Sequence, residues 1–99
     1  MRFHRPERVS DLIIEELNKL IVREIEFEPG VLVTITDVAV DRRLDTAKVR
    51  ISVIPLEKTE RVLEILQKFA GRLQRWLWKK INIRPMPRIE FTIDNQYNN

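Results

Sequence analysis

The 99-residue chain has no cysteine, one histidine and two glycines. Without cysteine it can form neither a disulfide nor a thiolate metal site, which excludes disulfide scaffolds, zinc ribbons and dithiol redox enzymes. Two glycines are too few for a phosphate-cradling loop, and His4 has no local partner as a metal ligand or general base. Hydrolase and metalloprotease motifs are also missing. The sequence therefore predicts a protein that is not an enzyme and has no cofactor or metal.

Long apolar runs are missing as well. No stretch approaches the roughly 18–20 apolar residues that cross a bilayer, and the first residues lack the apolar segment of a signal peptide. We therefore expect a cytoplasmic protein without a membrane partner. The length and a hydrophobic content of 43% suit one domain with one modest core, over residues 1–94, followed by a disordered tail at 95–99.

Acidic residues are absent from one long segment of the chain. From Ile65 to Arg88 there are seven basic residues and no acidic one: Lys68, Arg72, Arg75, Lys79, Lys80, Arg84 and Arg88. The net charge is −4 over residues 1–41, +9 over 42–88 and −2 over 89–99. A helix face that serves only solubility usually mixes both signs, so this segment indicates a polyanionic partner.

Hydrophobic periodicity predicts the secondary structure. A helix is expected from Pro6 to about Ile25, where apolar residues recur every three or four positions. Strands are expected at 31–40, 46–54 and 88–94, where β-branched or alternating apolar residues occur. A second helical region begins near Thr59, and Gly71 within it predicts either a kink that divides it into two helices or a close backbone approach. The alternative, one long helix that tolerates the glycine, stays open. The predicted fold is α+β, in the order α-β-β-α-kink-α-β, with the helices on one face of a three-stranded sheet.

The two tryptophans of the second helical region point in different directions. Consecutive helical positions diverge by about 100°, so Trp76 and Trp78 cannot both face the core. Trp76 continues an apolar stripe that consists of Val62, Leu66, Phe69, Leu73, Trp76 and Leu77, and is assigned to the core. Trp78 lies outside this stripe and is a candidate for stacking on a ligand or for contacting a partner. The alternative, partial burial against residues 82–87, stays open.

Several segments together resemble one known family. They are residues 8–17, the strands TITDVAV at 34–40 and AKVRISV at 47–53, Gly71 with Leu73 and Leu77, and the passage from IR at 83–84 through Pro87 to FTID at 91–94. The whole chain is similar to ribosome-binding factor A, a bacterial small-subunit maturation factor with a variant type II K-homology fold. In that family an Ala-X-Gly kink replaces the usual RNA-clamping loop. Here it corresponds to Phe69, Ala70 and Gly71, with phenylalanine in place of the alanine.

The resemblance implies several properties of this chain. The partner would be the immature small ribosomal subunit and its ribosomal RNA (rRNA), and the protein would aid late rRNA processing and cold adaptation. An assembly GTPase would promote its release, and the isolated protein would be a monomer. The arginine that the family carries three residues after the glycine is Gln74 here, and the acidic residue after the proline is Arg88.

We therefore predict a noncatalytic, RNA-binding ribosome assembly factor. The candidate RNA-facing residues are Arg72, Arg75, Lys79, Lys80, Arg84 and Trp78. Arg43 and Lys48 could extend this surface, although exposed cations also guard edge strands against aggregation. Two other hypotheses remain: a general nucleic-acid-binding or transcription module, and a protein-interaction adaptor that uses Trp78 and the apolar strand faces.

Overall fold

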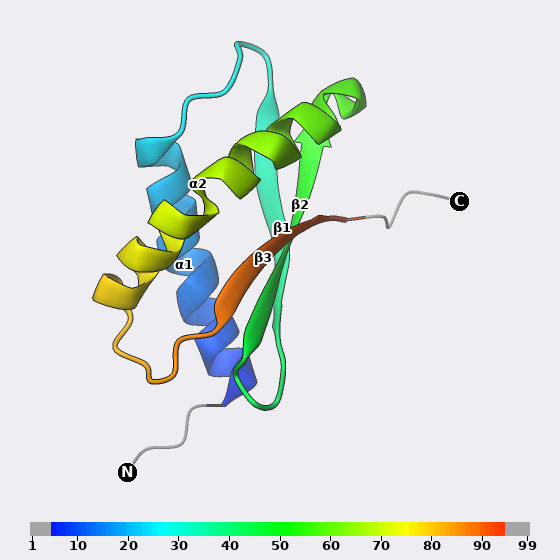
Figure 1. Cartoon of the computed structure of the whole chain (residues 1–99). Helices are drawn as coiled ribbons and strands as arrows, with labels where there is room; N and C mark the ends of the chain where they lie inside the picture. The colour runs from blue at the N-terminus through cyan, green and yellow to red at the C-terminus, as the bar shows by residue number, and fades with distance from the viewer. Residues whose placement is uncertain (1–4, 95–99) are drawn as a thin grey trace.

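The computed structural model describes residues 5–94 of the chain. The elements in order are α1 (Pro6–Glu24), β1 (Leu32–Val40), β2 (Thr46–Ile54), a short 3₁₀ helix η1 (Leu56–Lys58), α2 (Thr59–Lys80) and β3 (Arg88–Ile93) (Figure 1). The three strands form one sheet in the order β1-β2-β3, with β1 antiparallel and β3 parallel to β2. The predicted α+β class and three-stranded sheet are confirmed. The predicted tail at 95–99 lies outside the described residues.

The central strand β2 shows why the sheet has one buried face. Its residues Ala47, Val49, Ile51 and Val53 are all buried, whereas the residues between them are exposed or half-buried. Successive side chains of a strand point to opposite faces, so the buried set defines the side on which the helices pack. The other face of the sheet is open to solvent.

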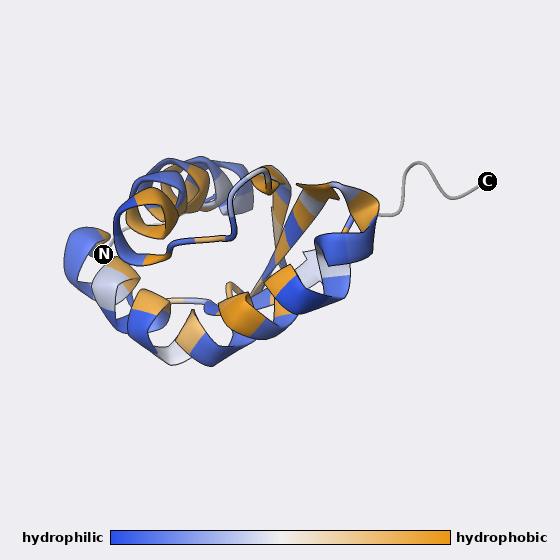
Figure 2. Ribbon diagram, turned by 90° about the horizontal axis from the view of Figure 1, so that it is seen from above, coloured by the Kyte–Doolittle hydropathy of each residue, from blue (hydrophilic) through white to orange (hydrophobic). Residues whose placement is uncertain are grey.

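The two helices complete the core with their apolar faces. The buried residues of α1 are Val9, Ile13, Leu17, Leu20 and Ile21, and those of α2 are Val62, Leu66, Leu73 and Leu77. Hydrophobic and hydrophilic residues alternate along both helices, as they do in amphipathic helices (Figure 2). Both sets belong to one cluster with the buried residues of the sheet. This cluster fixes α2 and therefore the direction in which its polar side points.

The predicted division of the second helical region is wrong. α2 is one helix from Thr59 to Lys80 and continues through Phe69, Ala70 and Gly71. A methyl group added at Gly71 would meet no atom within 4 Å beyond the local helix backbone, so the glycine does not serve a close approach either. Buried leucines precede and follow Gly71 on the apolar face of α2: Leu66 before it, and Leu73 and Leu77 after it. Their packing offsets the roughly 0.5–1 kcal/mol that a glycine costs inside a helix.

Replacing Gly71 by alanine is therefore expected to stabilise the protein by about 0.5–1 kcal/mol, because the site is helical, exposed and sterically open. Chemical denaturation followed by circular dichroism measures this change. Gln67→Ala, at another exposed position of α2, is the control and should have little effect because glutamine is already a good helix former. A loss of stability in Gly71→Ala would mean that α2 must bend at this residue in solution.

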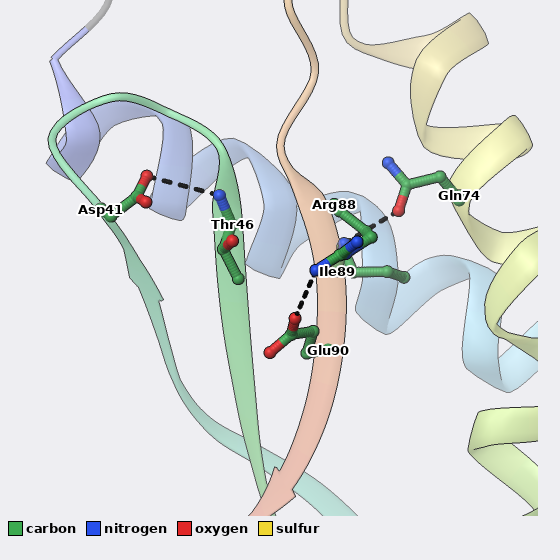
Figure 3. A network of polar contacts seen from close by, with 6 residues as sticks. All are labelled: Asp41, Thr46, Gln74, Arg88, Ile89 and Glu90. Carbon is green, nitrogen blue, oxygen red and sulfur yellow. Dashed lines mark hydrogen bonds and ion pairs between the residues drawn. The ribbon is translucent and has the colours of Figure 1, made fainter.

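The side chain of Gln74 holds β3 beside α2. Its Nε2 donates a hydrogen bond to the Pro87 carbonyl at 2.8 Å. Its Oε1 accepts one from the Ile89 amide at 2.9 Å, which Figure 3 shows. Both bonds are partly buried. The residue that stands in place of the family's arginine is thus occupied in positioning the first residues of β3 and is not presented to a ligand.

Candidate nucleic-acid interface

Four basic residues of α2 lie on one side of the helix. Lys68, Arg72, Arg75 and Lys79 are spaced by four, three and four residues, which places them one above another along the helix. We call these four residues the cationic stripe. All four are exposed, and they lie away from the direction in which Leu66, Leu73 and Leu77 enter the core. The core therefore sets the orientation of the stripe.

The charges of the stripe are not neutralised within the described part of the chain. Across residues 5–94, no ion pair involves Lys68, Arg72, Arg75, Lys79, Lys80 or Arg84. Arg88 differs, because its Nη2 lies 3.0 Å from Oε2 of Glu90 (Figure 3). Unpaired cations held on a rigid helix are suited to phosphate groups, whose attraction grows with the number of positive charges that meet them.

A hollow lies beside the stripe, where the C-terminal end of α1 meets α2. Its lining residues are Glu24, Arg72, Arg75, Trp76 and Lys79, and its volume is about 330 Å³. Trp76 is half-buried and packs against the core, in keeping with its predicted place. Its ring also makes two cation–π contacts. Arg23 Cζ lies 4.9 Å and Lys79 Nζ lies 5.8 Å from the ring centroid.

Arg23 is the residue near this surface that sequence reasoning missed. It lies on α1, far from α2 in the sequence, and its guanidinium reaches Trp76 only because the two helices cross near their C-terminal ends. The periodicity of each helix shows which residues face the core but not which helix ends meet. An alternation of basic and aromatic residues at the end of α1 would have indicated a binding surface there, but the sequence has no such pattern.

Trp78 and Arg84 form a second group, beyond the hollow. Trp78 is 56% exposed, and Arg84 Cζ lies 6.0 Å from its ring centroid. Lys80 is the exposed last residue of α2. Since Trp78 immediately precedes Lys79, this group adjoins the stripe but points about 100° away from it around the helix. The Trp78 ring is thus exposed in part and contacted in part by Arg84 from the segment 82–87, and its role in stacking stays a prediction.

The structure does not bring Arg43 and Lys48 to the same surface. Arg43 lies in the turn between β1 and β2, and Lys48 is on the solvent face of the sheet, opposite the side that the helices cover. Lys48 is paired in register with Glu90 of β3, and nearby Arg50 lies 3.4 Å from Asp37. Charges of both signs thus alternate on this face. The prediction that these two residues extend the α2 surface is not met.

Other classes of site are not found among residues 5–94. No group of three or more histidine, aspartate or glutamate side chains in this range is placed to hold a metal ion. His4 lies outside the described residues. None of the helices formed by residues 5–94 is both long and apolar enough to span a membrane.

Comparison with known proteins gives the family. The model of the family described as ribosome-binding factor A matches residues 5–99. Ribosome-binding factor A of Pseudomonas paraeruginosa is 40% identical over 95 residues, which cover 93% of this chain and 74% of that protein.

Solved structures agree with this fold. The crystal structure of ribosome-binding factor A from Thermus thermophilus has a TM-score of 0.64 at 21% identity and covers 89% of each chain. A homology model of the Thermus thermophilus factor, fitted into the cryo-EM map of a 30S complex with this factor, has a TM-score of 0.66 at 19% identity, and the match covers 99% of this chain and 100% of that one. The family match spans nearly the whole chain, and so this protein belongs to the ribosome-binding factor A family.

Proposed function

We propose that this protein is a noncatalytic assembly factor that binds the immature small ribosomal subunit through its rRNA. Membership of the ribosome-binding factor A family supports the proposal, as does the 30S complex of the Thermus thermophilus relative. We choose this surface because of the cationic stripe, whose four side chains form no ion pair with any carboxylate within residues 5–94. We assign the stripe, with Lys80 and Arg84, to contact with rRNA phosphates.

Binding in this scheme needs no chemistry from the protein. The rigid α2 presents Arg72, Arg75 and Lys79 together, so little backbone freedom is lost when they meet phosphates. Trp78 adds an exposed ring on which an unpaired base can stack, which is a common way to hold RNA without reading its sequence. The role of the protein is then to occupy and hold a region of RNA while the subunit matures.

We further propose the finer properties that the family resemblance implies. The protein acts in the cytoplasm, assists late rRNA processing, supports growth in the cold and leaves the subunit with the help of an assembly GTPase. It acts as a monomer. Arg43 and Lys48 contribute through the general field of the molecule rather than through direct contact, because they lie on other surfaces.

Cosedimentation with immature and mature small subunits, at several salt concentrations, tests the proposal. We expect preferential binding to immature subunits and a steep loss of affinity with salt. If all six assigned residues contact phosphates, the slope of log K against log salt should be roughly −4 to −5.5, since each contact contributes about −0.7 to −0.9. Salt-insensitive binding would contradict a phosphate-based interface.

Two other outcomes would favour the competing functions. Preference for duplex DNA over small subunits would indicate a general nucleic-acid-binding or transcription module. Binding that persists after the cationic stripe is neutralised would indicate a protein-interaction adaptor. For that adaptor, the exposed Leu32, Ile54 and Leu56 at one end of the sheet are the alternative surface, because Leu32 and Ile54 are register partners with 58% and 60% exposure.

A further inference from the structure

One feature of the hollow is not explained by binding phosphates alone. Glu24 contributes a carboxylate to a surface that otherwise presents Arg72, Arg75 and Lys79. It forms no ion pair with these three residues, and its Oε2 instead accepts a hydrogen bond from Nε of Arg23 at 3.1 Å. A negative charge weakens the attraction of phosphate to a neighbouring cation. The carboxylate therefore suits a ligand that also offers hydrogen-bond donors.

The hollow presents three kinds of group side by side. Arg72, Arg75 and Lys79 supply positive charge, and the Arg23 guanidinium lies over Trp76 while its side chain keeps 52% exposure. The Glu24 side chain is 25% exposed, and within residues 5–94 its Oε1 has no hydrogen-bond partner. A volume of about 330 Å³ is near the lower end of small-ligand pockets, which is about 300 Å³.

A single nucleotide has the complementary groups. Its phosphate pairs with the cations, its flat base stacks on the exposed face of a guanidinium, and the N–H groups of the base can donate to a carboxylate. The four bases differ at this last contact. Guanine presents two adjacent donors, N1–H and N2–H, whereas adenine and cytosine place a ring-nitrogen acceptor beside the amino group. Uracil places two carbonyl oxygens around its single N–H.

We propose that the hollow binds one unpaired guanosine of the RNA, with Glu24 as the residue that determines specificity. In this arrangement the guanine lies against the exposed face of Arg23, and Glu24 turns its carboxylate from Nε of Arg23 to the base to accept N1–H and N2–H. Arg72, Arg75 and Lys79 meet the adjoining phosphates. The inference rests on the proposed RNA-binding function. It adds a preferred base to a surface that would otherwise recognise only the RNA backbone.

Short single-stranded uridine oligonucleotides that differ at one central base provide the test, with fluorescence anisotropy as the measurement. The oligonucleotide with a central guanosine should bind about tenfold more tightly than those with adenosine, cytidine or uridine, since a well-formed bidentate base contact discriminates by about 1–3 kcal/mol. In Glu24→Gln the preference should fall to about twofold or less, because the amide presents one acceptor oxygen where the carboxylate has two. Binding of the all-uridine RNA should be unchanged or tighter.

Glu16→Gln is the matched control. It removes the same charge from the same helix, at a side-chain exposure of 22% against 25% for Glu24, but Glu16 does not line the hollow. The guanosine preference should survive in this variant. Guanosine monophosphate is a second probe, and it should compete poorly with the RNA, because it lacks the neighbouring phosphates that the three cations meet.

Trp76 provides an independent readout. The chain has two tryptophans, so in Trp78→Phe the emission comes from Trp76 alone. The guanosine oligonucleotide should change this emission with the dissociation constant that anisotropy gives for the same Trp78→Phe variant. An emission change for the uridine oligonucleotide of equal size and affinity would contradict a guanosine site beside Trp76.

The outcomes separate this inference from the function on which it rests. Equal affinity for all four oligonucleotides, with ratios unchanged by Glu24→Gln, overturns the guanosine site and leaves the proposed function standing. If the oligonucleotides bind too weakly to measure, cosedimentation of Glu24→Gln with small subunits decides, and affinity equal to that of Glu16→Gln overturns the site. Failure to bind small subunits or any RNA overturns the proposed function itself.

Discussion

Reversing three charges of α2 together, Arg72→Glu, Arg75→Glu and Lys79→Glu, is expected to weaken binding to small subunits by on the order of 100-fold or more. Each reversal replaces an attraction to phosphate by a repulsion, and two unit charges about 4 Å apart interact by about 1 kcal/mol even in water. The slope of log K against log salt should at the same time become less negative by about 2–3, because three phosphate contacts are lost. Cosedimentation across a salt series measures both quantities.

The control for this experiment is an equal reversal elsewhere, in the variant Arg42→Glu, Arg43→Glu, Lys48→Glu. These residues lie in the β1–β2 turn and on the solvent face of the sheet, away from the cationic stripe. Their reversal changes the net charge by the same amount but removes no proposed contact, so it should weaken binding by only about a few-fold through the screened long-range field. Equal losses in both variants would mean that net charge, and not the α2 surface, determines binding.

The fold was largely predictable because its signals are local. The alternation in β2 and the helical spacing in α1 and α2 each arise within one element, and each reports directly which side of that element is buried. The stripe on α2 could be predicted for the same reason, since Arg72, Arg75 and Lys79 share one helix and their relative directions follow from its geometry.

The hollow could not be predicted because it depends on how two elements meet. Arg23 and Glu24 look like ordinary solvated charges at the end of α1, and only the crossing of α1 and α2 places them beside Trp76. The reverse error arose with Arg43 and Lys48. Their positive charge suggested that they belong to the same surface as the basic residues of α2. Lys48, however, lies on the solvent face of the sheet, so the sheet separates it from α2.

The continuity of α2 through Gly71 shows how tertiary packing overrides local propensity. A glycine in a helix costs about 0.5–1 kcal/mol, whereas burying a leucine side chain contributes about 1.5–3 kcal/mol. With Leu66 buried before Gly71, and Leu73 and Leu77 buried after it, one continuous helix buries more apolar surface than two helices that diverge. The sequence contains both signals, but weighing them requires knowing that all three leucines reach the same core.

Three consecutive residues of α2 show how one turn of helix serves stability and binding at once. Arg72 points to the hollow, Leu73 to the core, and Gln74 to β3. Successive positions differ by about 100°, so these three directions are a consequence of helical geometry. Substitutions at the three positions should therefore have separable effects.

Leu73→Ala is accordingly expected to lower stability sharply while leaving RNA affinity nearly intact. Leu73 is fully buried, and truncating such a leucine costs about 2–5 kcal/mol through lost burial and the cavity that remains. Because a small domain loses about 4–8 °C of melting temperature per kcal/mol, the melting temperature should fall by at least about 8 °C.

The comparison variant is Leu56→Ala, which makes the same chemical change at a residue with 78% exposure and should alter stability by about 0.5 kcal/mol or less. At a temperature where Leu73→Ala is still folded, its RNA affinity should stay within about threefold of the unmodified protein, which is less than 1 kcal/mol, since Arg72 and Arg75 keep their exposed positions. A large loss of affinity in the folded variant would show instead that the cationic stripe needs exact core packing to meet the RNA. In that case, stability and binding would not be separable along this helix.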